Sequence, residues 1–289
     1  MTDDNENDRL QTDRHAPKTQ NSFADAAAVQ NEDAAAVQKS RNHMKPDAKQ
    51  YTAAYKSWVF LSARWRHLIL ASYAVEPGLL RPHVPPGLEL DLVDGRAFVS
   101  LVAFQFLDTR VLNLKIPFHV NFPEVNLRFY VRAGQKRGVC FIREIVPRAA
   151  VARAARAVYN EPYEALAMDS KVEADAQTIA ARYSVVRKRR THSIEVKAQN
   201  RPYLPEPDSP AHFFKEHEWG FGRTRKGKTI VYRVEHPHWR VYPVRSYRID
   251  VDFGALYGPK WAALNGEKPI DLSFAEGSAV KVYPPRLAQ

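Results

Sequence analysis

The chain alternates between apolar and polar residues with a period of two over several stretches, which is typical of β-strands that bury one face. The clearest stretch is 122–132, FPEVNLRFYVR, and the turn AGQKRG connects it to a second apolar stretch at 139–146. These two stretches predict a β-hairpin. The Asp94-Gly95 pair, which precedes the apolar run 97–106, indicates another hairpin.

Helical patterns are few and short. The alanine-rich stretch 149–160 is the longest, and Pro77 and Pro210 each begin a shorter one, with Ser209 as the N-cap of the latter. Further strands are predicted at 67–75, 172–186, 193–199, 229–234 and 241–251. Because strands and helices do not alternate regularly, a doubly wound sheet is not expected. We expect an α+β protein dominated by a curved, mainly antiparallel sheet, of which a barrel is one form, with a few short flanking helices.

Residues 1–50 differ from the rest in composition. They contain few large apolar side chains, repeat DAAAVQ at 25–30 and 33–38, and carry nine acidic against seven basic residues. Such a segment cannot bury enough apolar area to offset its chain entropy. We predict a disordered tail over 1–50 and a single domain over 51–289. Since the whole chain has a formal charge of +11, the predicted domain carries +13.

The sequence gives no sign of a membrane or secreted protein. Its longest apolar run, 98–107, is shorter than the roughly 18–20 residues of a spanning helix, and the acidic N-terminus lacks the apolar core of a signal peptide. The single cysteine, Cys140, cannot form an intrachain disulfide, which fits a reducing compartment. We therefore expect a cytoplasmic protein.

The most informative candidates for chemistry lie on the strand predicted at 122–132. Glu124, Asn126, Arg128 and Tyr130 share one face of that strand. Together they offer a general acid or base, a two-way hydrogen bonder, an anion clamp and a phenol. In a barrel interior these charges would be costly unless they were paired or used. The alternative is an ordinary solvated face on which Glu124 pairs with Arg128.

Two basic clusters, 182–190 and 222–228, suggest a second class of function. Binding of nucleic acid or another polyanion would use Arg187–Arg190 and Arg223–Lys228, with aromatic residues nearby for stacking. Both clusters fall at predicted hairpin turns, which are exposed in any protein, and no helix-turn-helix, RNP, KH or zinc-finger signature accompanies them. Solvated turns are the simpler interpretation.

Metal and cofactor motifs are absent from the sequence. His236 and His238 flank Pro237, but no HExxH or paired CxxC is present, and the glycines form no phosphate-binding loop. We expect neither a metal nor a cofactor.

Several segments in order resemble a known family: 66–106 (with VPPGLELD and DGRAFVSLV), FPEVNLRFYVR, VYNEPYEA at 158–165 and YRVEHPHW at 232–239. They resemble the YqjF-like family of uncharacterised conserved bacterial proteins, within the acetoacetate decarboxylase-like superfamily. The resemblance covers Trp58 to Pro285. It implies a β-cone or barrel with flanking helices and a ligand cavity inside the cone.

The same resemblance bears on the chemistry. In the decarboxylases of that superfamily a lysine forms a Schiff base, and a second lysine beside it lowers its pKa. Tyr163 and Glu164 stand where those lysines should be, so Schiff-base decarboxylation is not expected. Glu124 resembles the acidic residue of the decarboxylase cavity.

These observations lead to one expectation about function. The protein binds or transforms a small organic acid or ketone in the cavity, with Glu124 as acid or base and Arg128 as the clamp for a carboxylate. Asn126, Tyr130, Tyr163 and Glu164 would contact the ligand. Whether the protein is an enzyme, such as a lyase, stays open at this point.

Overall fold

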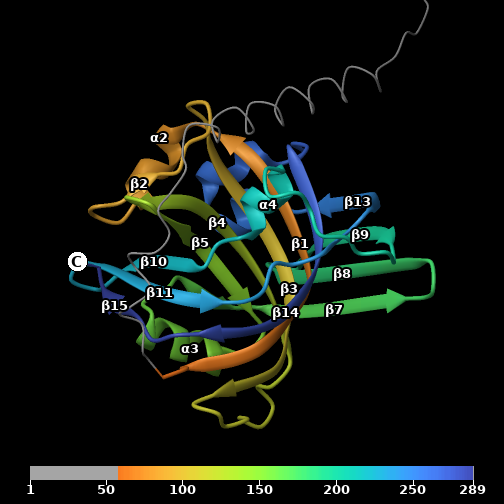
Figure 1. Ribbon diagram of the computed structural model, residues 1–289, viewed down its shortest axis with the longest axis horizontal. Coiled ribbons are helices and arrows are strands. Elements are labelled where there is room, and N and C mark those ends of the chain that lie inside the picture. The colour runs from red at the N-terminus through yellow and green to blue at the C-terminus, as the bar shows by residue number, and fades with distance from the viewer. Residues whose placement is uncertain (1–57, 289) are drawn as a thin grey trace, which may run out of the picture.

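The computed structural model describes residues 58–288, and its elements are labelled in Figure 1. The predicted tail at 1–50 lies outside the described residues. The strands are β1 (Leu61–Val75), β2 (Glu89–Leu90), β3 (Ala97–Val111), β4 (Phe122–Ala133), β5 (Lys136–Val146), β6 (Tyr163–Ala165), β7 (Ala167–Ala174), β8 (Thr178–Arg187), β9 (Arg190–Gln199), β10 (Trp219–Arg223), β11 (Thr229–Glu235), β12 (Val241–Tyr242), β13 (Val244–Asp250), β14 (Asp271–Val282) and β15 (Arg286–Leu287). The helices are α2 (Pro77–Leu80), α3 (Ala149–Val158), α4 (Pro210–Lys215) and α5 (Phe253–Tyr257), with 3-10 turns η2 (Arg81–His83) and η3 (Pro259–Leu264).

The larger of the two sheets has eleven strands. Its main path runs in the order β12-β14-β1-β3-β4-β5-β10-β11-β15, while β2 pairs with β4 and β6 with β5. An additional pairing joins β11 to β14, with Val234 opposite Val282. The order of hydrogen-bonded strands therefore comes back to β14. Nearly all pairings are antiparallel, the exceptions being those of β5 with β10 and β6. The prediction of a mainly antiparallel α+β protein with few short helices is confirmed.

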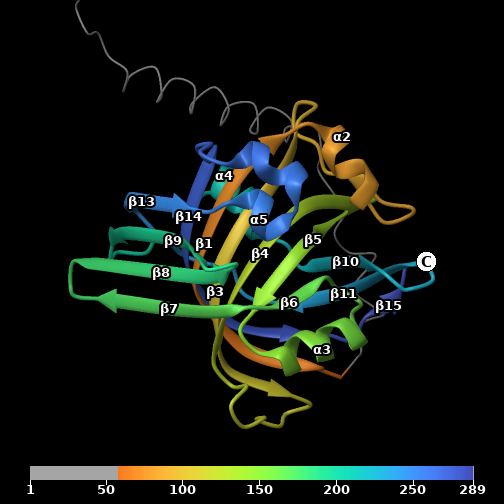
Figure 2. The ribbon, with the colours of Figure 1, turned by 180° about the vertical axis from the view of Figure 1, so that it is seen from behind.

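A second sheet, in the order β13-β9-β8-β7, packs against one face of the larger sheet, and Figure 2 shows it on the same side as α5. Leu127 and Phe129 of β4 share a hydrophobic cluster with Tyr183 and Ile194 of this second sheet. The apolar face of β4 is therefore buried between the sheets, and its other face turns toward the interior of the larger sheet.

Three predicted elements differ from the structure, and one of them, 241–251, forms β12 in the larger sheet and β13 in the second sheet. Stretch 172–186 forms two strands rather than one, because Asp175 Oδ1 accepts hydrogen bonds from the backbone N–H of Gln177 and of Thr178 and so makes a turn. Near Asp94-Gly95 a single bridge joins Val93 to Arg96, and β2 pairs with β4 instead of β3. Both turns exist, but the strand partners differ from those predicted.

The longest element that the sequence pattern missed is β14, which pairs with β1 over most of its length. Gly277 interrupts its alternation with a φ of 80°, a left-handed conformation that favours glycine. A β-carbon at this position would overlap the Trp65 carbonyl of β1. Among residues 58–288, no helix is long and apolar enough to cross a membrane.

Candidate functional site

A cavity of about 270 Å³ lies inside the larger sheet and is bounded by β1, β3, β4, β5, β10, β11 and α3. Most of its wall is apolar, and large side chains that line it include Trp65, Val102, Phe104, Phe122, Phe141 and Trp239. Helix α3 closes one side with small residues, Ala150 and Ala154, which bring its backbone close to the cavity. An apolar chamber of this kind favours the carbon skeleton of a small ligand.

Strand β4 supplies the first polar group of the cavity, through the alternation visible in its sequence. Glu124, Asn126 and Arg128 line the cavity, whereas Leu127 and Phe129 pack on the opposite face. Glu124 and Asn126 are buried and Arg128 is half-buried. The row of polar side chains therefore lies in an enclosed space and not on a solvated surface.

Both carboxylate oxygens of Glu124 are held in place. Oε1 accepts a hydrogen bond from Asn126 Nδ2 at 2.9 Å, and Oε2 accepts one from the Tyr163 hydroxyl at 3.1 Å. Burial raises the pKa of Glu124 to about 7, although these two hydrogen bonds and the Arg128 charge favour the ionised form. A carboxyl group in this state can both accept and donate a proton near neutral pH.

Two further buried acids, Glu144 of β5 and Glu161 before β6, join Glu124 in the cavity wall. Glu161 Oε1 accepts a hydrogen bond from the Tyr232 hydroxyl at 2.5 Å, and burial raises the pKa of Glu161 to about 7. Burial and the two neighbouring carboxylates raise the pKa of Glu144 well above its ordinary range. This shift favours the protonated form of Glu144, which donates a hydrogen bond to Glu161.

Glu144 was not predicted, because a β-bulge changes the register of the hairpin. Near the turn, Arg132 lies opposite Arg137, and an unbroken hairpin would place Arg143 opposite Asn126. The register shifts between Leu127 and Arg128, so that Asn126 lies opposite Glu144 instead. The bulge therefore places Glu144 at the position on the cavity face where an unbroken hairpin would place Arg143.

The structure places two of the predicted ligand contacts outside the cavity lining. Tyr130 is buried, and its hydroxyl bonds to Ser100 Oγ at 2.5 Å and to the Phe214 carbonyl at 3.3 Å. Glu164 bonds to Arg143 at 3.1 Å and to Arg187 at 2.6 Å. Successive residues of a strand point to opposite sides, so Tyr163 faces the cavity while Glu164 faces away. Glu124, Asn126, Arg128 and Tyr163 are the predicted residues that come together.

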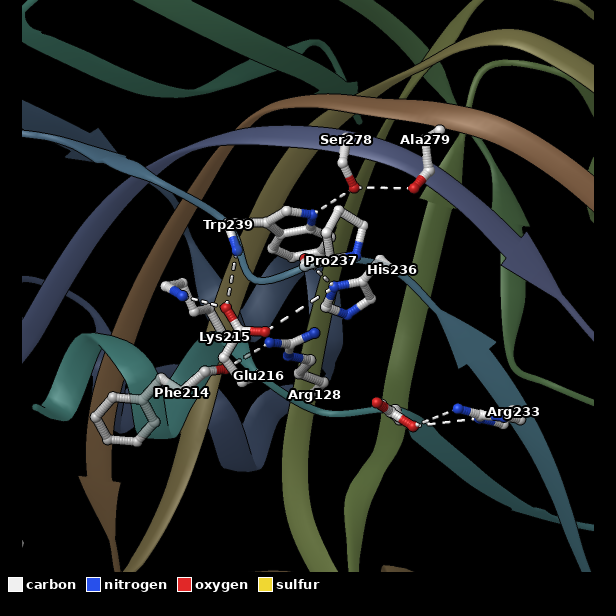
Figure 3. Close-up of polar contacts among 11 residues, drawn as sticks. Arg128, Phe214, Lys215, Glu216, Arg233, His236, Pro237, Trp239, Ser278 and Ala279 are labelled. Atoms are coloured by element: carbon white, nitrogen blue, oxygen red, sulfur yellow. Dashed lines mark hydrogen bonds and ion pairs between the residues drawn. The ribbon is translucent and has the colours of Figure 1, made fainter. Parts of the chain in front are cut away.

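Several polar atoms of the lining are buried without a hydrogen-bond partner among the described residues: Asn126 Oδ1, Arg128 Nε and Glu144 Oε2. Arg128 is held by its terminal nitrogen, which donates to the Phe214 carbonyl at 2.7 Å (Figure 3). A buried polar atom without a partner costs about 1–3 kcal/mol. These atoms offer hydrogen bonds to a ligand on the same face as Glu124.

The predicted basic cluster at 182–190 is partly neutralised by acidic neighbours. Arg187 pairs with Glu164, and Arg190 pairs with Asp250 at 3.1 Å and with Asp252 at 3.3 Å. Acidic side chains of the same protein therefore balance part of the positive charge at the β8–β9 turn. Polyanion binding stays a prediction that no contact described here supports.

One group of side chains in the described part of the chain could hold a metal ion. It consists of His212, Glu216 and His238, which do not line the cavity.

Comparison with protein families gives one match that spans most of the chain. The model of DUF2071, described as "Uncharacterized conserved protein (COG2071)", matches residues 62–279. A relative from Bacillus subtilis (strain 168), "Uncharacterized protein YqjF", is 27% identical over 183 residues, which is 63% of this chain and 74% of the relative.

Solved structures with a similar fold are much more distant in sequence. The enduracididine biosynthesis enzyme MppR with bound HEPES buffer has a TM-score of 0.57 and 13% identity, covering 83% of this chain and 91% of its own. Acetoacetate decarboxylase from Legionella pneumophila subsp. pneumophila str. Philadelphia 1 has a TM-score of 0.54 and 13% identity, covering 86% and 94%. These similarities show an acetoacetate decarboxylase-like fold.

Proposed function

The chain belongs to the DUF2071 family of uncharacterized conserved proteins, and we propose that it binds a small ketone or organic acid in its cavity and transfers a proton to or from it. The observation that carries this proposal is the state of Glu124, which faces an apolar cavity with both oxygens held and a pKa of about 7. General acids and bases act best when their pKa lies near the working pH.

Arg128 supplies the complementary group. Its guanidinium is a cation, and its Nε–H has no hydrogen-bond partner among the described residues. A positioned, charged donor in a buried site stabilises an oxygen on which negative charge develops. We assign Glu124 the role of base at a carbon next to a carbonyl group. In this arrangement Arg128 stabilises the enolate oxygen that forms when the proton leaves.

The wall of the cavity indicates which ligands fit. The apolar side chains favour a short carbon skeleton, and three buried acids disfavour a ligand that places an anion beside them. Arg128 is the cation on this face, so its charge also attracts a carboxylate of the ligand. MppR, whose fold is similar, has been solved in complex with pyruvate, which is a compound of this class.

Imine chemistry does not enter this mechanism. Among the described residues that line the cavity none is a lysine, and Tyr163 and Glu164 cannot form an imine. Proton transfer by carboxyl groups needs no such intermediate.

Deuterium exchange tests the proposal directly. Pyruvate and butanone are incubated with the protein in D2O, and the loss of protons next to the carbonyl is followed by NMR. We expect exchange above the background rate for at least one of the two compounds, and Glu124→Gln should reduce it by about 100-fold or more. Glu164→Gln is the control, because Glu164 pairs with Arg143 and Arg187 away from the cavity. Background exchange with both compounds, or equal rates for the wild type and Glu124→Gln, would overturn the proposal.

A further inference from the structure

A second constellation lies at the end of α4, separate from the carboxyl groups of the cavity. His212, Glu216 and His238 each direct one donor atom into a common space, and the three atoms lie within 4.8 Å of one another. We propose that these residues bind a divalent transition metal ion, and that Zn²⁺ suits the set. Two imidazoles and one carboxylate are a ligand combination typical of zinc.

The local backbone explains why two of the ligands are adjacent. The backbone N–H of Glu216 donates to the carbonyl of His212 at 3.1 Å, which is the spacing of one helical turn. Residues four apart on such a turn lie on the same side. His238 comes from the segment before β12, and its ring centroid lies 5.2 Å from that of His212.

The carboxylate of Glu216 is fixed in a way that leaves one oxygen for the metal. Oε1 accepts hydrogen bonds from Lys215 Nζ and from the Trp239 backbone N–H, the latter at 3.0 Å (Figure 3). Oε2 has a more distant neighbour, His236 Nδ1, at 4.0 Å. Hydrogen bonds of this kind to a ligating carboxylate orient it for the metal.

The environment of the three donors suits an ion with an open coordination position. His238 is exposed, while His212 and Glu216 are half-buried, so solvent reaches the cluster from one side. With bonds of about 2.0–2.1 Å, the donors of a tetrahedral site lie about 3.3–3.5 Å apart. Small side-chain rotations therefore bring the three donors to this spacing, and water occupies the fourth position.

The sequence led us to expect no metal, because no spacing of histidines along the chain resembles a known motif. The cluster combines a short helix with a distant segment, and only the fold brings them together.

Titration of the untagged, full-length protein with Zn²⁺ in a calorimeter tests the site. We expect one ion per chain, with affinity reduced roughly tenfold or more in His238→Ala and in His212→Gln. His238 is exposed, so its replacement leaves folding intact, which circular dichroism verifies. His119→Ala is the matched control, because the His119 ring bonds to the Pro117 carbonyl and does not belong to the cluster, so the variant should keep its Zn²⁺ affinity.

Titration with Co²⁺ gives a second readout, since visible absorption reports the coordination of this ion. We expect a four-coordinate spectrum in the wild type that is lost in His238→Ala. The proposal of a metal site would be overturned if the wild type did not bind the ion, or if the wild type and both histidine variants bound it with equal affinity. Glu124→Gln should bind Zn²⁺ normally, so this result is independent of the proton-transfer proposal.

Discussion

The Tyr163 hydroxyl donates a hydrogen bond to Oε2 of Glu124 across 3.1 Å and so connects β6 to β4, although β5 lies between these strands. The phenol is the hydrogen-bond partner of that oxygen, while Asn126 donates to the other one. The contact favours the ionised form of Glu124 and opposes the effect of burial on its pKa.

Tyr163→Phe should therefore raise the pKa of Glu124 further above its value of about 7. The variant keeps the ring and loses the donor, so the ionised carboxylate loses one of its two hydrogen bonds. We expect the low-pH limb of the deuterium-exchange profile, on which the rate rises as Glu124 loses its proton, to move to higher pH by about half to one unit. Tyr283→Phe removes a comparable Tyr–Glu hydrogen bond, to Glu235, and should leave the profile in place. A profile that is the same in wild type and Tyr163→Phe would contradict this assignment.

Much of the site could be predicted from one strand. The period-two pattern of 122–132 places Glu124, Asn126 and Arg128 on one face, and the burial of Leu127 and Phe129 on the other face determines which side is the cavity. Pattern alone does not say that the polar face is enclosed, because that depends on the curvature of a sheet built from distant strands.

The rest of the acidic cluster could not be predicted, for two physical reasons. Glu144 reaches the cavity through the β-bulge between Leu127 and Arg128, and a bulge of this kind leaves no mark in the hydrophobic pattern. Glu161 lies in the connection between α3 and β6, where the chain has no regular period. Its position depends on the Tyr232 hydroxyl of β11, a contact between segments far apart in sequence.

Gly220→Ala should disturb the acidic cluster through Tyr232. These two residues lie opposite each other in β10 and β11, and a β-carbon on Gly220 would overlap the Tyr232 ring. The ring must move, and its hydrogen bond to Glu161 is then lost. We expect a loss of about 1–3 kcal/mol in the free energy of unfolding, measured by urea denaturation, together with weaker exchange activity.

Gly222→Ala is the matched control for this prediction. It lies in the same strand, but its β-carbon would meet Ile230 at 3.5 Å, an ordinary packing distance. Equal effects of the two substitutions would show that the result reflects the strand and not the Tyr232 ring.

Glu164→Gln should affect stability slightly and exchange activity not at all. Its carboxylate pairs with Arg143 and Arg187, and all three side chains are about one quarter to one third exposed. Partly exposed ion pairs contribute about 0.2–1 kcal/mol. We expect the free energy of unfolding, measured by urea denaturation, to fall by an amount in that range. In 1 M salt the difference between the variant and the wild type should be smaller, because salt screens the ion pairs. A large loss of exchange activity would instead place Glu164 in the functional site.

The buried carboxyl groups should make stability fall as pH rises. The pKa values of Glu124 and Glu161 are about 7 in the folded protein, and burial raises that of Glu144 well above its ordinary value, whereas all three are about 4.5 in the unfolded chain. Between these values the folded state holds more protons than the unfolded state, so the free energy of unfolding decreases with pH. Each group contributes a slope of up to about 1.4 kcal/mol per pH unit. Burial lowers the pKa of some histidines, such as His67, and these residues make stability rise with pH. The decisive measurement is therefore the comparison of a variant with the wild type.

Glu144→Gln isolates one of these groups, because glutamine keeps a hydrogen-bond donor toward Glu161 and cannot ionise. Urea denaturation at pH 5, 6, 7 and 8 should show that the variant loses less stability than the wild type by about 1 kcal/mol per pH unit above pH 5. Asp271→Asn is the control for a half-buried acid that does not line the cavity. The pKa of Asp271 is about 6, so its contribution should end near that pH. Parallel stability curves for the wild type and Glu144→Gln would show that Glu144 is ionised in the folded protein, and Glu144 could then not donate a hydrogen bond to Glu161.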